Sequence, residues 1–81
     1  MRYQLYRYNQ PNPNDYNFRA IEFLSDNDSN MWKRTSIAER INNYKFEPTS
    51  NWIKITFEPS VHKFSNWVKD LTKAEAFLEL L

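Results

Sequence analysis

The chain of 81 residues contains no glycine. Glycine is the residue that takes positive φ angles without strain and lets a backbone approach a phosphate closely. Phosphate-binding loops, dinucleotide fingerprints and the sharp turn that presents a catalytic serine all depend on it. The ordinary forms of these motifs are therefore excluded. We expect the ten asparagines to occupy the left-handed turn positions instead, since asparagine tolerates that conformation better than most residues do.

The absence of cysteine excludes disulfides, a thiolate nucleophile and cysteine-ligated metals. A chain this short has a thin core, but 17% of its residues are aromatic and each ring buries a large area. We therefore expect one domain over residues 1–81. The formal net charge of +1 supplies no field that would by itself attract nucleic acid.

Nothing in the sequence predicts a membrane partner. No apolar run approaches the length of a membrane span, and the first residues lack the apolar segment of a signal peptide. Together with the missing cysteines, this pattern predicts a cytoplasmic protein.

Three segments have the pattern of β-strands. Residues 1–8 alternate, with Tyr3 and Leu5 on one side and Tyr6 and Tyr8 on the other. Residues 16–24 fit a strand or a helix. Their length and aromatic content favour a strand that pairs with the first across the proline- and asparagine-rich loop at 9–15. Residues 52–57, rich in β-branched and aromatic side chains, give the clearest strand pattern.

Helix starts are indicated at three places. Ser36 and Glu39 have the spacing of a capping box, which predicts a helix over 36–44. Ser60 can cap a second helix, with apolar residues at spacings of three and four up to residue 71. Thr72 and Glu75 form another capping box, which opens either a new short helix or a continuation of the preceding one. The predicted class is therefore α+β: an N-terminal β-hairpin, a helix, a third strand and a C-terminal helix, one long or two short.

Few residues have the spacing of a catalytic or metal site. The loop at 26–30 begins like a calcium-binding loop, but Met31 and Ile37 stand where that loop needs glycine and a bidentate glutamate. His62 is the only histidine, and the acidic residues show no pairing that favours carboxylate chemistry. We therefore expect no metal, no cofactor and no catalytic residue. A metal-independent, nuclease-like activity is kept as a third hypothesis.

The surplus of aromatic residues beside basic ones favours a protein-binding surface, because tyrosine, tryptophan and arginine dominate the contact energy of protein interfaces. We expect a small intracellular binding module of the adaptor or inhibitor type, suited to a phage or mobile element, whose partner is another protein. The first strand, taken as a sheet edge, could add to a partner's sheet; alternatively, its tyrosines simply pack with their hydroxyls in water. The predicted contact residues are Tyr3, Tyr6, Arg7, Tyr8, Trp32, Lys33 and Arg34.

A nucleic-acid-binding protein is the alternative. Lys33 and Arg34 precede the predicted helix at 36–44, whose free amides could hold a phosphate, and Arg40 follows within it. The predicted contacts for DNA or RNA are Lys33, Arg34, Arg40 and Lys45. A homodimer is a further hypothesis, because the apolar segment at 77–81 gains from burying more surface.

Overall fold

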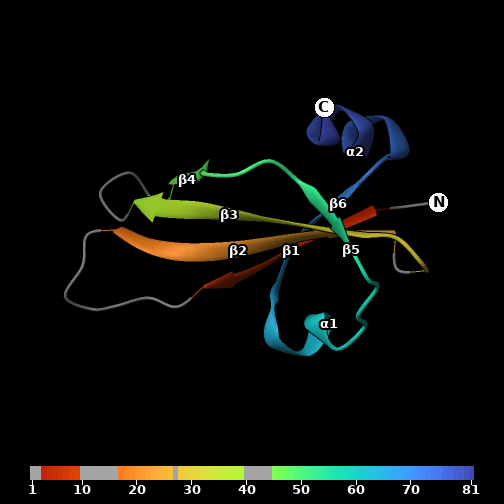
Figure 1. The fold of residues 1–81 in the computed structure, drawn as a ribbon, viewed down its shortest axis with the longest axis horizontal. Coiled ribbons are helices and arrows are strands. Elements are labelled where there is room, and N and C mark those ends of the chain that lie inside the picture. The colour runs from red at the N-terminus through yellow and green to blue at the C-terminus, as the bar shows by residue number, and fades with distance from the viewer. Residues whose placement is uncertain (1–2, 10–16, 27, 40–44) are drawn as a thin grey trace.

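The computed structural model describes residues 3–9, 17–26, 28–39 and 45–81. Within these ranges the chain forms a six-stranded antiparallel sheet in the order β4-β3-β2-β1-β6, with β5 beside β3 on the same edge as β4 (Figure 1). The strands are β1 Tyr3–Asn9, β2 Asn17–Ser25, β3 Met31–Glu39, β4 Lys45–Pro48, β5 Ile53–Ile55 and β6 Asn66–Leu71. The helices are α1 Val61–Phe64 and α2 Lys73–Leu80.

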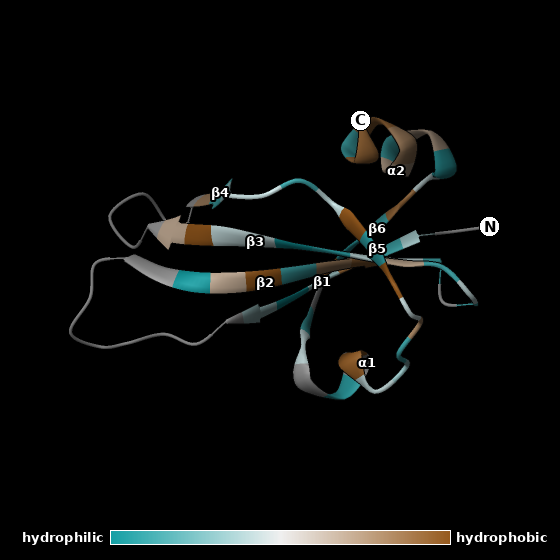
Figure 2. Cartoon of the chain, in the orientation of Figure 1, coloured by the Kyte–Doolittle hydropathy of each residue, from teal (hydrophilic) through white to brown (hydrophobic). Residues whose placement is uncertain are grey.

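The pairing register gives the sheet an inner and an outer face. On the inner face, Tyr3, Leu24 and Leu71 form a buried cluster with Ala76 of α2. α1 lies on the outer face, and Figure 1 shows the two helices on opposite sides of the sheet. Figure 2 shows hydrophobic and hydrophilic residues along both β2 and β3, without strict alternation. Successive side chains of a strand point to opposite faces, so the pairing register assigns each residue of β2 and β3 to one face.

The sheet is curled around its inner face. The Arg7 guanidinium on β1 lies 3.4 Å from the centroid of the Phe46 ring on β4, although β2 and β3 separate these two strands. In a flat sheet, three strand spacings would hold the two backbones about 14 Å apart. A bulge in β6, where the register with β1 skips Val68, adds local twist.

The predicted pairing of the first two strands is confirmed. β1 and β2 run antiparallel, with Gln4 opposite Ser25 at one end and Asn9 opposite Ala20 at the other. Residues 16–24, for which a helix was the alternative, therefore form a strand over nearly their whole length. The strand predicted over 52–57 is shorter in the structure, where β5 spans three residues.

The α+β prediction is wrong, and its first error is the helix over 36–44. Residues 36–39 continue β3, and residues 40–44 lie outside the described ranges. Ser36 pairs with Ala20 on one side and with Pro48 on the other. Its hydroxyl is buried and has no hydrogen-bond partner among the described residues, so it caps nothing. Pairing with two neighbouring strands thus outweighs a local helix signal.

The second error is the helix expected over 60–71. Only the four residues of α1 are helical, and the Ser60 side chain makes no cap hydrogen bond. Residues 66–71 form β6, which pairs with β1. β1 therefore lies between two strands, so the expectation that it adds to a partner's sheet as an edge strand is also wrong.

The capping box at Thr72 is confirmed, and of the two alternatives it opens a new short helix. The Thr72 hydroxyl accepts a hydrogen bond from the Glu75 amide at 3.2 Å, and the Glu75 carboxylate accepts one from the Thr72 amide at 3.1 Å. α2 then places Ala76 against the sheet. Neither helix in the described part of the chain is long and apolar enough to cross a membrane.

Replacing Thr72 by alanine removes the side-chain half of this cap. We expect Thr72→Ala to lower the free energy of unfolding by about 1 kcal/mol, because an amide at the start of α2 loses its partner. Urea denaturation followed by circular dichroism measures the change. Thr56→Ala, at an exposed position outside any helix, is the control and should change stability by less than about 0.5 kcal/mol. Equal stability of Thr72→Ala and the control would show that the cap contributes nothing.

Candidate functional site

A buried carboxylate lies at the centre of the inner face. Glu22, in the middle of β2, is only 1% exposed and stands directly opposite Arg7 on β1 and Arg34 on β3. Its Oε2 lies 3.3 Å from Arg7 Nη2, and its Oε1 lies 3.4 Å from Arg34 Nε. Arg34 Nη1 also reaches Glu79 Oε1 of α2 at 2.8 Å. These ion pairs connect three adjacent strands to the C-terminal helix.

Aromatic rings cover both arginines. The Arg7 guanidinium lies over the Phe46 ring, and the Arg34 guanidinium lies 4.3 Å from the ring centroid of Trp52. Such a ring excludes water from the ion pair and adds a cation–π attraction. Arg7 and Arg34, two of the predicted contact residues, are therefore occupied in holding the sheet together.

Two of the predicted aromatic contacts also lie on the inner face. Tyr3 is 7% exposed and belongs to the core. Trp32 is half-buried, packs against that core, and has its ring centroid 6.2 Å from that of Tyr3. The amine of Lys54 lies 5.8 Å from the Trp32 ring centroid. Because a ring enclosed in this way offers little area to a partner, neither residue is included in the surface proposed below.

The remaining predicted contacts lie on the outer face. Tyr6 is 8% exposed, and its hydroxyl donates a hydrogen bond to the Gln4 side chain at 2.6 Å. Tyr8 is half-buried and Lys33 is exposed. Of these three, Tyr8 and Lys33 have surface that a partner could contact.

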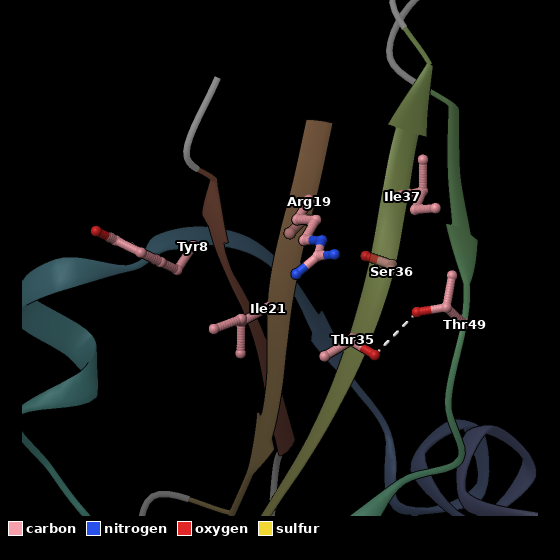
Figure 3. A pocket seen from close by; sticks show the side chains of 8 residues that line it. Tyr8, Arg19, Ile21, Thr35, Ser36, Ile37 and Thr49 are labelled. Atoms are coloured by element: carbon pink, nitrogen blue, oxygen red, sulfur yellow. Dashed lines mark hydrogen bonds between the residues drawn. The ribbon is translucent and has the colours of Figure 1, made fainter. Parts of the chain in front are cut away.

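Tyr8 borders a hollow of about 550 Å³ on the outer face, which we call the outer groove. Figure 3 shows Arg19 and Ile37 on the adjacent strands β2 and β3, with Thr49 at the β4 side. The Thr35 and Thr49 hydroxyls are 2.9 Å apart and hydrogen-bond to each other across that edge. The outer groove is lined by Tyr8, Arg19, Ala20, Ile21, Thr35, Ser36, Ile37 and Thr49.

A second hollow of about 290 Å³ lies where α1 meets the sheet, and we call it the α1 pocket. It is lined by Tyr8, Ile21, Phe23, Val61 and Ser65. Tyr8 and Ile21 belong to both hollows, so the groove and the pocket adjoin each other. Their described lining is mostly apolar, with Arg19 at the end away from α1.

Sequence reasoning did not select Arg19, Ile21 or Ile37 as contacts. The alternation along 16–24 does place Arg19 and Ile21 on one side of the strand, which is the signal that could have found them. It could not show which side is covered. Ile37 belongs to the segment 36–44, for which the sequence predicts a helix, but in the structure it lies on β3 and is 38% exposed.

The basic residues of the nucleic-acid hypothesis do not form one cluster in the described part of the chain. Successive residues Lys33 and Arg34 point to opposite faces of β3, and Arg34 is ion-paired. Arg40 lies outside the described residues, as does the side chain of Lys45, whose backbone belongs to β4. Residues 36–39 are strand, so the helix amides expected to hold a phosphate are not there.

The loop at 26–30 is held by one of its own carboxylates. Asp26 Oδ1 accepts hydrogen bonds from the amides of Asp28, Ser29 and Asn30 at 2.9–3.0 Å, and Oδ2 accepts one from the Asn30 side chain at 2.7 Å. Burial raises the pKa of Asp26, but these hydrogen bonds outweigh burial and lower the pKa to about 2. Among the residues described, no group of three His, Cys, Asp or Glu side chains could hold a metal ion. The His62 side chain lies outside the described part.

Comparison of the chain with models of known protein families, with curated proteins and with solved structures gives no match.

Replacing Glu22 by glutamine tests the central ion pairs. We expect Glu22→Gln to lower the free energy of unfolding by about 3 kcal/mol, because two partly buried guanidiniums lose their shared counter-charge. Chemical denaturation measures the loss. Glu58→Gln, at an exposed position, makes the same chemical change and should cost less than about 0.5 kcal/mol. A Glu22→Gln protein as stable as this control would contradict the role assigned to the carboxylate.

Asp26→Asn tests the charge that holds the 26–30 loop. The pKa of Asp26 is depressed in the folded state from its ordinary value of 3.8, so its stabilising effect is fully present above about pH 4 and is lost as the pH falls towards 2. We expect Asp26→Asn to be less stable than the parent chain at pH 7, by about 1–2 kcal/mol. Between pH 4 and pH 2 that difference should shrink.

Unfolding measured at several pH values checks this expectation. Asp28→Asn, whose side chain is exposed, is the matched control and should track the parent chain throughout. A stability difference between Asp26→Asn and the parent chain that stays constant down to pH 2 would rule out the charge of Asp26 as its cause.

Proposed function

We propose that the chain is a small protein-binding module of the adaptor or inhibitor type, which binds another protein through the outer groove and the α1 pocket and catalyses no reaction. The observation that carries the proposal is the adjoining pair of hollows on the outer face. The proposal includes a cytoplasmic location, because a chain without cysteine does not depend on disulfides and is compatible with a reducing environment.

The composition of this surface supports a protein partner. Tyr8 supplies a ring with a polar tip, Arg19 a guanidinium, and Ile21 and Ile37 apolar area. Tyrosine and arginine are the residue types that protein interfaces favour, and apolar area beside them gains from losing water. Lys33 is exposed on the same face, opposite Phe23 of the α1 pocket. The proposed contact residues are Tyr8, Arg19, Ile21, Lys33 and Ile37.

The two edges of the sheet are poorly suited to pairing with a strand of a partner. This supports binding through the outer face. On one edge, residues 49–52 interrupt the pairing with β3 between Pro48 and Ile53. On the other edge, β6 carries the bulge at Val68 and an exposed lysine, Lys69. Proline, bulges and lysine are the usual means of preventing a sheet edge from pairing with another chain.

The experiment is capture of proteins from a lysate of the cells that make this chain, with a variant in the outer groove. We expect the parent chain to retain a stoichiometric protein partner. Ile37→Asp should retain it at least about tenfold less, because a carboxylate then stands on the apolar floor of the interface. Quantitative mass spectrometry of the retained proteins measures the difference. Capture should survive nuclease treatment of the lysate.

Leu78→Asp is the matched control, since Leu78 lies on α2, across the sheet, and is 72% exposed. Circular dichroism and thermal melting confirm that both variants fold. No partner, or a partner bound equally well by Ile37→Asp, would overturn the proposal. A partner lost only with Leu78→Asp would move the interface to α2, where the homodimer hypothesis also places it.

A further inference from the structure

Arg19 differs from the two arginines of the inner face, because no carboxylate of a described residue forms an ion pair with it. Arg7 and Arg34 both pair with Glu22. Arg19 is exposed at the outer groove, and its cross-strand neighbour is Ile37. Beyond Ile37 lies Glu47 of β4, two strand spacings or about 10 Å from the Arg19 backbone; Glu47 has an interaction of its own.

Among the described residues that line the outer groove, Arg19 is also the one that carries a charge. A guanidinium presents a planar fork of N–H donors that matches a carboxylate with two parallel hydrogen bonds. Beside apolar side chains such as Ile21 and Ile37, that pairing is screened less by water than on an open surface. The described lining of the groove is therefore complementary to a negative group at Arg19.

The α1 pocket requires a different chemistry. Most of its wall is apolar, because it is formed by Phe23, Val61, Ile21 and the ring of Tyr8. A hollow of about 290 Å³ with such walls gains most from a bulky aliphatic or aromatic side chain. The two adjoining hollows thus select two different side chains.

Strand β2 fixes the distance between the arginine of the outer groove and the apolar wall of the α1 pocket. Arg19, Ile21 and Phe23 are alternate residues that share the outer face, so Arg19 and Phe23 are about 13 Å apart along the strand. An extended peptide lying along β2 rises by the same distance per residue. It would bring a carboxylate and a bulky apolar side chain to the two hollows when they are two to four residues apart.

We infer that the outer groove and the α1 pocket together recognise an extended peptide segment of the partner, with an aspartate or glutamate at Arg19 and a bulky apolar residue under α1. This inference rests on the proposed function. Single-stranded nucleic acid is less well matched, because only two exposed cations, Arg19 and Lys33, are identified among the described outer-face residues of β2 and β3.

The test is selection from a phage-displayed library of random linear twelve-residue peptides on the immobilised full chain. We expect the enriched peptides to share an aspartate or glutamate two to four residues from a large apolar residue. A synthetic enriched peptide then binds the parent chain, and Arg19→Glu should weaken that binding by about tenfold or more. A peptide with lysine in place of its acidic residue should regain affinity for Arg19→Glu.

Lys69→Glu is the control, because it makes the same change of charge on the exposed part of β6. It should bind the original peptide as the parent chain does. No enrichment of the motif, or equal binding by Arg19→Glu and the parent chain, would overturn the inference. Binding of a single-stranded oligothymidylate that is lost with Arg19→Glu and falls steeply with salt would assign the face to nucleic acid instead.

The two proposals fail in different ways. If enriched peptides lose affinity with Ile37→Asp but not with Arg19→Glu, protein binding through this face stands and the carboxylate requirement falls. If no peptide is enriched and no protein is captured in an Ile37-dependent way, both proposals fall together.

Discussion

The carboxylate of Glu22 is buried in the sheet, where it is almost completely shielded from water. A charge buried on its own at that depth would destabilise the fold by several kcal/mol. Here the two neighbouring strands each contribute an arginine at the directly opposing position, so the carboxylate is compensated from both sides. Removing Glu22 would leave Arg7 without this carboxylate, whereas Arg34 would keep its ion pair with Glu79.

The same ion pairs determine the shape of the sheet. Arg7 reaches Glu22 and the Phe46 ring at once, which brings β4 over the inner face towards β1. Arg34 reaches Glu79 and the Trp52 ring, which holds α2 and the 49–52 segment over that face. The concave side is thereby closed. In the described part of the chain, α1 lies on the convex side and the outer groove adjoins it.

Local signals in the sequence predicted those strands and helix caps that are determined by residues close together along the chain. The alternation in 1–8, the length and aromatic content of 16–24 and the capping box at Thr72 and Glu75 are such signals, and the structure contains the strands and the cap. The identical Ser–Glu spacing at 36 and 39 failed because Ser36 lies between two distant strands. Thr72 follows the end of a strand, where a helix can begin. A capping box alone does not distinguish these two positions.

The candidate site could be predicted less well than the fold, because register decides which arginine is available. Arg7 and Arg19 both lie in strands among apolar and aromatic residues. The register places Arg7 opposite Glu22 on the inner face, and Arg19 opposite Ile37 on the outer face. A slip of one residue would exchange the faces of either strand. Residue type therefore indicates that an arginine can bind a carboxylate, whereas strand pairing determines whether that carboxylate belongs to this chain or to a partner.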